Sequence, residues 1–331
     1  MNQPAISVMI PTRNRAESLK KALDSLVTQS FKDFELVVAD GGSTDNTKAL
    51  VFSYEKHFPV RWTVLKEPGL SKAMNAALKI AQGTYVIRTD DDVFFSKDWL
   101  TGVWETFQNH KQVGGVTGPT VLPKEHAQMR DLFYFEDKFR RGNIFWKAIG
   151  KLYYDYFLEG TAYRVSHWCK SGAFTLGTNF VSALNEPVQE VNNLEACNWA
   201  VRKDLLARIG GFDLIYTGLG EYHEPDAALK IQKSGYKLMF NPKAFLYHCP
   251  SIDGFYKDRP KSFSRIINFI TFYCRHIKPN APDKCLRFFL YLGFQNAYYV
   301  FQAISKKQLN LLGAIPGTFV GLFNIITGLR R

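Results

Sequence analysis

Short apolar runs alternate with longer amphipathic segments along the first 90 residues. The runs that have the length and β-branched composition of buried strands are residues 6–10, 34–39, 60–65 and 84–88. The segments between them, in which apolar residues recur at helical spacing, are residues 17–28, 47–56 and 71–81. Strands that alternate with helices predict an α/β fold with a mostly parallel sheet and helices on both of its faces.

The pattern is less regular beyond residue 119. Residues 132–163 are rich in aromatic side chains and predict one or two helices that pack partly against an apolar surface. A strand followed by a helix is predicted over residues 198–209, and a further helix over residues 225–234. Residues 237–241 and 244–248 then predict two short strands.

The end of the chain differs from the rest in both charge and hydrophobicity. Residues 255–331 hold twelve lysines and arginines but two acidic residues, and so carry most of the net charge of +12. The same region contains two apolar stretches of nineteen residues, 286–304 and 311–329. We therefore predict an α/β domain at residues 1–254, with halves 1–118 and 119–254, followed by a helical region at residues 255–331.

The flanks of the two apolar stretches favour helices that lie in the membrane interface over helices that cross it. A spanning hairpin would translocate Lys306 and Lys307 in its turn, against the positive-inside tendency, and Arg287 interrupts the first stretch. Interfacial helices would set basic residues against anionic headgroups and place the protein peripherally on the cytoplasmic side of the membrane. The alternative is that these helices pack on the catalytic domain or on a second subunit of a homo-oligomer. The apolar stretches give no reason to expect nucleic acid as a partner.

The cysteines and the N-terminus also indicate a cytoplasmic protein. The five cysteines are odd in number and contain no C-x-x-C pair, which favours reduced thiols. Residues 6–11 lack the basic segment and cleavage site of a signal peptide and are interpreted as the first strand.

Polar clusters follow three of the predicted strands. They are Pro11-Thr12-Arg13-Asn14-Arg15, the turn from Asp40 to Thr47, and Asp90-Asp91-Asp92. Because ligands of an open α/β sheet bind at the carboxyl ends of its strands, we expect these clusters to share one crevice. The first suits a nucleotide through backbone N–H groups at a helix start, and Asp40 can accept hydrogen bonds from a base or ribose. The alternative is a plain helix start for the first cluster and a capped turn without a ligand for the second.

The acidic triplet predicts a cation. Three carboxylates at one strand end repel one another, and oxygen ligands favour Mg²⁺ or Mn²⁺ over zinc. A solvated acidic loop is the alternative interpretation.

Taken in order, these motifs resemble those of the family 2 glycosyltransferases of GT-A fold. The resemblance is carried by I-P-T-x-N-R in the first strand, D-G-G-S-T-D-N-T after the second, P-G-L-S-x-A-x-N at residues 68–75, and D-D-D. It covers about residues 5–250 and is strongest before residue 100. It implies a GT-A catalytic domain that transfers a sugar with inversion.

The resemblance also implies roles for individual residues. Asp40 would contact the nucleoside, Asp90 the ribose, and Asp92 the metal. The residues assigned to the nucleotide sugar are Pro11, Thr12, Arg15, Asp40, Ser71, Asn75, Asp90 and Asp91. His248, at the end of a predicted strand, is similar to a histidine that completes metal coordination in GT-A enzymes; the alternative is a structural histidine.

Downstream, the family carries G-G-F-D and then E-D-x-D with a glycine nine residues later. This chain has G-G-F-D at residues 210–213 and then H-E-P-D at residues 223–226, with Gly235 nine residues after Asp226. Glu224 thus takes the place of the catalytic aspartate, and Glu221 is the nearest competitor. Asn198, Trp199 and Asp226 are assigned to the acceptor, although Trp199 could equally be a core residue and Asp226 a helix cap.

These assignments predict a metal-dependent glycosyltransferase. Its donor would be a UDP- or GDP-sugar, its cofactor Mn²⁺ or Mg²⁺, and its acceptor a hydroxyl of a glycan or lipid-linked molecule. Glu224 would remove the acceptor proton while the cation stabilises the leaving diphosphate. The alternatives are a nucleotidyltransferase of related fold and a non-catalytic membrane adaptor on a GT-A scaffold.

Overall fold

The computed structural model describes residues 3–65, 67, 69–123, 131–250 and 262–329. Eight strands form one central sheet in the order β3-β2-β1-β4-β9-β6-β10-β8, and three short strands form a second sheet in the order β5-β11-β7. The strands are β1 (Ile6–Thr12), β2 (Phe34–Asp40), β3 (Val60–Val64), β4 (Tyr85–Arg88), β5 (Val93–Phe95), β6 (Val113–Thr117), β7 (Thr120–Val121), β8 (Gln189–Val191), β9 (Trp199–Arg202), β10 (Lys237–Phe240) and β11 (Leu246–His248).

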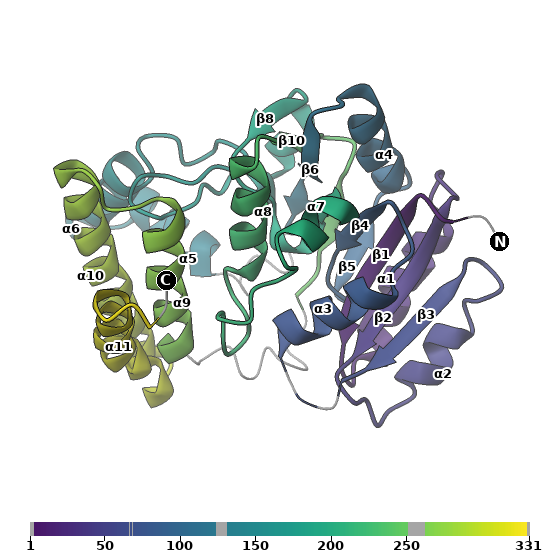
Figure 1. The fold of residues 1–331 in the computed structure, drawn as a ribbon. Coiled ribbons are helices and arrows are strands. Elements are labelled where there is room, and N and C mark those ends of the chain that lie inside the picture. Colours follow the sequence, from purple (N-terminus) through teal and green to yellow (C-terminus); the bar gives the residue numbers. More distant parts are fainter. Residues whose placement is uncertain (1–2, 66, 68, 124–130, 251–261, 330–331) are drawn as a thin grey trace.

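The helices fall into two groups. Those that accompany the sheet are α1 (Ala16–Val27), α2 (Thr47–Phe52), α3 (Leu70–Ile80), α4 (Trp99–Asn109), α7 (Lys203–Arg208) and α8 (His223–Lys233). Those at the other end of the molecule are α5 (Asp131–Arg141), α6 (Ile144–Lys151), α9 (Ser262–His276), α10 (Pro282–Ser305) and α11 (Ala314–Ile326). Figure 1 shows the C-terminal helices and β3 at opposite ends of the molecule.

The predicted α/β architecture is confirmed, with one qualification about strand direction. Strands β1 to β4 pair in parallel, as do β6 and β10, whereas β9 runs antiparallel to both of its neighbours. The register sets Thr12 opposite Asp40, so the carboxyl ends of β1 and β2 lie side by side. The predicted helices within residues 132–163 correspond to α5 and α6, and a π-helical turn follows them at Leu152–Phe157.

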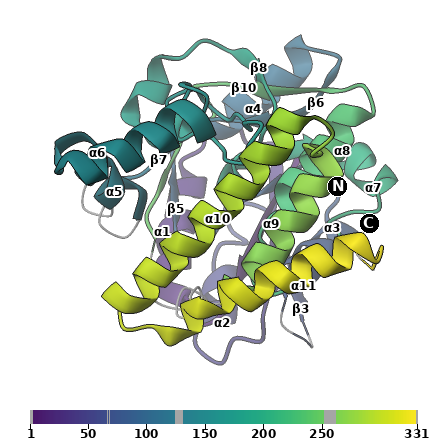
Figure 2. The same cartoon turned by 90° about the vertical axis from the view of Figure 1, so that its left-hand side faces the viewer.

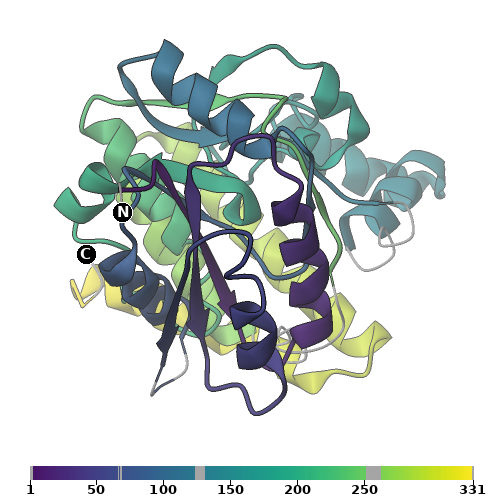
Figure 3. The same cartoon turned by 90° about the vertical axis from the view of Figure 1, so that its right-hand side faces the viewer.

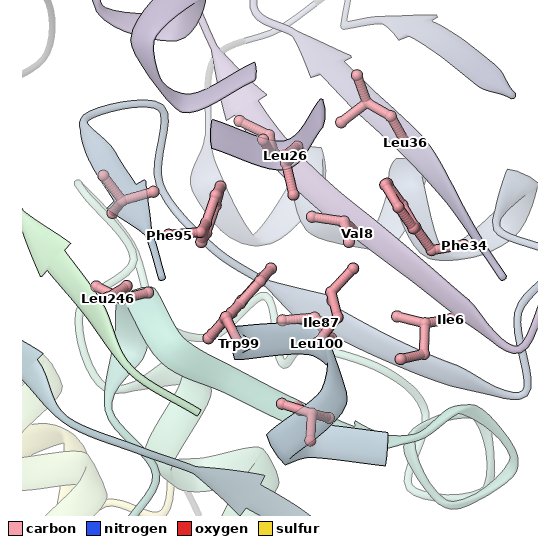
Figure 4. Packing of buried hydrophobic residues seen from close by; sticks show 14 of the residues in the cluster. Ile6, Val8, Leu26, Phe34, Leu36, Ile87, Phe95, Trp99, Leu100 and Leu246 are labelled. Carbon is pink, nitrogen blue, oxygen red and sulfur yellow. The ribbon is translucent and has the colours of Figure 1, made fainter. Parts of the chain in front are cut away.

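Two apolar clusters cover the two faces of the central sheet. On one face, Val8, Leu36 and Ile87 pack against Leu26 of α1 and Trp99 of α4, and all five side chains are buried. Figure 4 shows these side chains directed toward one another. The alternation along a strand turns the neighbouring residues to the other face, where α3, α7 and α8 cover them. The N-terminal strands, purple in Figure 3, therefore form a layer between two layers of helices.

The C-terminal helices have a core of their own and also contact the part of the chain that contains the central sheet. Ile266, Phe269, Phe288 and Leu292 are buried between α9 and α10. A further cluster joins α9 to the sheet domain, and in it Phe272 packs with Trp168 and with residues of the α8 region. Figure 2 shows α10 and α11 in front of α9, with α5 and α6 beside them. Residues 309–326 form one helical segment that is long and apolar enough to cross a membrane, with mean hydropathy 1.7 and 22% of it buried.

Candidate active site

A cavity of ≈ 600 Å³ lies at the carboxyl ends of the central strands. Its walls come from the loops after β1, β2 and β4, from the start of α8, and from α9. Seven of the residues predicted for the site line it: Pro11, Thr12, Arg15, Asp90, Asp91, Asp92 and Glu224. The parallel strands thus bring together clusters that lie far apart in the sequence.

One end of the cavity holds a compact charge cluster. The hydroxyl of Thr12 donates to Asp91 Oδ2 at 2.7 Å. Arg15 reaches Asp91 Oδ1 with Nε at 3.2 Å and Asp92 Oδ2 with Nη2 at 2.9 Å. The guanidinium and both carboxylates are almost completely buried, so their mutual attraction is screened less than it would be at the surface.

The environments of the two carboxylates differ. Burial raises the pKa of Asp91 to about 7, although the charge of Arg15 opposes the shift. Burial acts in the same direction on Asp92, but its hydrogen bond with His248 and the charge of Arg15 outweigh it and hold its pKa well below the usual range. Asp92 is therefore ionised at neutral pH, and His248 Nε2 lies 3.4 Å from its Oδ1.

A divalent cation fits beside this cluster. Donor atoms of Asp90, Cys197 and His248 all lie within 4.8 Å of one another. Ligands of one ion, each about 2.1 Å from it, lie up to roughly 4.2 Å apart, so small side-chain adjustments would suffice. The carboxylate suits Mn²⁺ or Mg²⁺, whereas the imidazole and, more strongly, the thiol favour softer transition metals.

Arg88 connects the acidic cluster to Glu224. It is buried at the end of β4, and its Nη2 lies 2.8 Å from Asp90 Oδ1 while its Nε lies 3.2 Å from Glu224 Oε1. Its third nitrogen donates to the carbonyl of Ala196 at 2.7 Å. One fully engaged guanidinium therefore sets the separation between two carboxylates of the cavity.

Glu224 is also held from the other side. His223 Nε2 lies 3.0 Å from Glu224 Oε1, and His223 Nδ1 lies 2.6 Å from the hydroxyl oxygen of Ser71. Burial alone would raise the pKa of Glu224, but the charges of His223 and Arg88 lower it to about 2. The Glu224 carboxylate is consequently ionised and fixed in place, and in this environment without a ligand it is a weaker base than a carboxylate whose pKa lies near the operating pH.

Other predicted donor-site residues lie near the cavity without lining it. Asp40 is buried and accepts hydrogen bonds from the Ser43 amide at 3.0 Å and the Ser43 hydroxyl at 2.5 Å, which closes its own turn. Asn75 is bonded through both of its amide atoms to the backbone of Phe212. Ser71 contacts His223, as described above. These contacts show how each side chain stabilises the walls of the site.

Residues 7–166 match the model of glycosyl transferase family 2. Over these residues, slightly less than half of the chain, the protein is similar to that family. They include the clusters after β1, β2 and β4, whereas Glu224 and His248 lie beyond the matched region.

Relatives with curated descriptions are glycosyltransferases. A PGL/p-HBAD biosynthesis glycosyltransferase of Mycobacterium bovis is 30% identical over 152 residues, which cover 45% of this chain and 59% of the relative. The chondroitin synthase of Escherichia coli is 32% identical over 96 residues, which cover 29% of this chain and 14% of that protein. The chain thus spans less than two thirds of the length of either relative.

Solved structures share the fold. A mannosyltransferase from Pyrobaculum calidifontis in complex with GDP-Man and Mn²⁺ aligns with a TM-score of 0.56 at 16% identity, over 98% of this chain and 88% of that one. TarS 1-349 of S. aureus in complex with UDP-GlcNAc aligns with a TM-score of 0.57 at 18% identity, over 96% and 79%. At these identities the likeness concerns the GT-A fold.

None of the three residues predicted to bind the acceptor, Asn198, Trp199 and Asp226, lines the cavity. Trp199 is fully buried in β9, where its ring packs on Phe212, because strand alternation turns it toward the core. Asn198 uses its amide to accept from Trp99 Nε1 at 2.8 Å and to donate to the Ala244 carbonyl at 2.7 Å. Asp226 points from α8 toward α9, and its Oδ1 lies 2.8 Å from His276 Nε2.

The sequence interpretation also missed several residues of the site. Arg88 opens the segment that ends in the acidic triplet and His223 belongs to the H-E-P-D motif, but neither was given a role; a charged residue inside a buried strand was a usable signal for Arg88. Cys197 had no spacing signal. Other cavity residues without a predicted role come from irregular loops or from α9, among them Trp168, Phe174, Tyr222 and Arg265.

Proposed function

We propose that this protein transfers a glycosyl group from a nucleoside-diphosphate sugar to an acceptor hydroxyl with inversion at the anomeric carbon. The observation that carries the proposal is the single cavity in which Glu224 faces the cluster of Thr12, Arg15 and the three aspartates. The family 2 match and the nucleotide sugars bound by structures of the same fold support the choice of donor class.

Each end of the cavity would carry out one part of the reaction. The acceptor oxygen forms a bond to the anomeric carbon while the bond from that carbon to the β-phosphate oxygen breaks. Glu224 takes the acceptor proton, and the nucleoside diphosphate leaves with the bonding electron pair. One displacement of this kind inverts the anomeric centre. A cation held by Asp90, Asp92 and His248 would stabilise the charge of the leaving diphosphate.

Substitution of Glu224 by Gln tests this assignment because it keeps the shape of the side chain and removes its basicity. We expect turnover to fall by about 10²–10⁴-fold, with the affinity for the nucleoside diphosphate changed less than about twofold. Glu105→Gln is a matched control, since Glu105 pairs with Lys243 on the surface away from the cavity. Wild-type turnover by the Glu224 variant would remove Glu224 from the role.

Product analysis separates the proposal from the other enzyme class. A glycosyltransferase releases a nucleoside diphosphate, whereas a nucleotidyltransferase releases inorganic diphosphate. The screen uses UDP- and GDP-sugars with Mn²⁺ or Mg²⁺, and the shift in unfolding temperature ranks the donors. If no nucleoside diphosphate is released and no donor changes the unfolding temperature, the result would favour a non-catalytic adaptor.

We also propose that the C-terminal helices bind the cytoplasmic face of a membrane peripherally. Phe319, Phe323 and Ile326 of α11 expose 69%, 59% and 79% of their surface, and Leu309 before them exposes 76%. Lys306 and Lys307 are exposed next to this apolar face. Apolar side chains flanked by cations suit an anionic lipid surface.

Vesicle flotation tests the membrane proposal with the full chain. We expect binding to vesicles of phosphatidylglycerol and phosphatidylcholine, weaker binding to phosphatidylcholine alone, and loss of binding in Phe319→Asp/Phe323→Asp. The control is Phe94→Asp, a change of a half-exposed phenylalanine on β5. Equal flotation of the α11 variant and the wild type would contradict the proposal.

A further inference from the structure

The cavity continues beyond Glu224 into a part that the donor does not need. This part is lined by Trp168 and Phe174 from the loop after the π-helical turn, by Glu221 and Tyr222 before α8, and by Arg265 of α9. Tyr222 and Glu224 both line the cavity and are two residues apart in the sequence. A molecule that packs on Tyr222 would therefore lie close to the proposed base.

The aromatic wall is rigid. Trp168 Nε1 donates to Asn193 Oδ1 at 3.0 Å, and the Trp168 ring lies 4.6 Å from the ring of Phe272 behind it. Phe174 meets Trp168 edge to face at 5.4 Å and keeps 38% of its surface exposed. Rings that are already fixed lose little conformational entropy when a ligand stacks on them.

Tyr222 completes the wall in a strained conformation. Its φ of 76° lies in the left-handed region, which costs a bulky residue about 1 kcal/mol or more. Its ring packs against Phe272 at 5.3 Å, and this packing holds the backbone in that conformation. Such strain is concentrated at functional sites. Here it allows Tyr222 and Glu224, on either side of His223, to line the same cavity.

Two charged side chains sit beside the aromatic wall. No described residue forms a hydrogen bond or salt bridge with the Arg265 guanidinium, and Oε2 of Glu221 is buried without a hydrogen-bond partner. Tyr299 and then Glu221 raise the pKa of Arg265, so the guanidinium is charged. The loop that holds Glu221 is fixed to α9, because Asn268 donates to the Thr217 carbonyl at 2.9 Å.

We propose that this part of the cavity is a saccharide subsite, in which a pyranose ring of the acceptor packs on Trp168, Phe174 and Tyr222 while Arg265 and Glu221 hydrogen-bond its hydroxyl groups. A sugar presents an apolar C–H face to aromatic rings and hydroxyls that both donate and accept. A phosphate fits less well, since the Glu221 carboxylate would repel it. The inference rests on the proposed function and names the class of acceptor.

Saturation-transfer NMR on the full-length protein tests the subsite directly. The probes are methyl glycosides of glucose, galactose, mannose and N-acetylglucosamine, each measured with UDP or GDP and Mg²⁺ present. We expect at least one glycoside to receive saturation from the wild type. Phe174→Ala and Arg265→Gln should each weaken its binding by about tenfold and leave the nucleotide affinity within about twofold.

Phe94→Ala is the matched control, because Phe94 is a half-exposed phenylalanine outside the cavity lining. No saturation transfer to any of the glycosides, with normal nucleotide binding, would overturn the subsite while leaving the proposed function intact. Weaker nucleotide binding with unchanged glycoside binding in Phe174→Ala would also overturn it. Absence of nucleotide binding by the wild type would instead count against the proposed function.

Discussion

The buried carboxylate of Asp226 joins the catalytic domain to the C-terminal helices, and its removal should destabilise the protein. Asp226 Oδ1 lies 2.8 Å from His276 Nε2 of α9, and Oδ2 lies 2.7 Å from Lys230 Nζ. The hydroxyl of Tyr216 donates to the same carboxylate at 2.9 Å. Asp226→Asn keeps the volume but removes the charge, which leaves His276 and Lys230 without this partner.

The pKa of Asp226 gives the magnitude of the effect. Burial raises it, but the hydrogen bonds from His276 and Lys230 dominate and lower it to about 2 from the usual 3.8. Each unit is worth about 1.4 kcal/mol, so the charged form contributes about 2–3 kcal/mol to the free energy of unfolding at neutral pH. For a chain of 331 residues, with an unfolding entropy of about 2.1 cal/mol/K per residue, the unfolding temperature should fall by roughly 3–4 °C.

The sign of the pH dependence provides the stricter test. Because the folded-state pKa is depressed, the contribution of Asp226 is fully present above pH 3.8 and is lost as the pH falls toward about 2. The difference between the wild type and Asp226→Asn in thermal or urea unfolding should therefore be constant near neutrality and shrink below about pH 4. Asp204→Asn is the control, since its side chain is 50% exposed and should cost less than about 0.5 kcal/mol. A difference that did not vary between pH 6 and pH 2.5 would refute this account.

Four further substitutions test separate parts of the structure. Trp199→Ala should lower the free energy of unfolding by about 3–5 kcal/mol in urea titrations, because it empties a fully buried site in the core. Asp92→Asn should reduce the increase in unfolding temperature that UDP or GDP produces in the presence of Mn²⁺. The unfolding temperature of the unliganded protein should change less than this increase does. Gly118→Ala should destabilise, because an added Cβ would lie 2.0 Å from the Ala244 carbonyl oxygen, whereas Gly293→Ala in α10 meets nothing within 4 Å and should stabilise by about 0.5–1 kcal/mol.

Local patterns in the sequence predicted the parts of the fold that local interactions determine. Strands β1 to β4 and helices α1 and α3 follow from periodic apolar positions, and their boundaries agree within a few residues. The short strands β5 and β7 are three and two residues long, too short for any periodicity to reveal them, whereas β11 lies within the strand predicted over residues 244–248. They depend on pairing partners that are distant in the sequence.

The residues of the site show the same difference between local and long-range interactions. Thr12, Asp91 and Asp92 could be predicted because each follows directly on a strand whose place in the sheet is itself predictable. Trp199 was assigned to the acceptor only from its residue type, and burial in β9 places it in the core instead. Trp168 and Arg265 could not be found in this way, because one lies in an irregular loop and the other on a helix whose docking depends on contacts across the fold.

Helix α9 is the element that makes the proposed acceptor subsite and the proposed membrane face parts of one unit. Arg265 lines the cavity from this helix, while Phe269 packs on Phe288 of α10 with ring centroids 6.0 Å apart. At its C-terminal end, His276 contacts Asp226, two residues from Glu224 on α8. A helix held at both ends cannot shift relative to the base without breaking the buried Asp226 contact or opening the apolar core. A sugar whose lipid anchor rests against α10 and α11 would therefore enter the cavity at a fixed distance from Glu224, which is the arrangement that transfer to a membrane-bound acceptor requires.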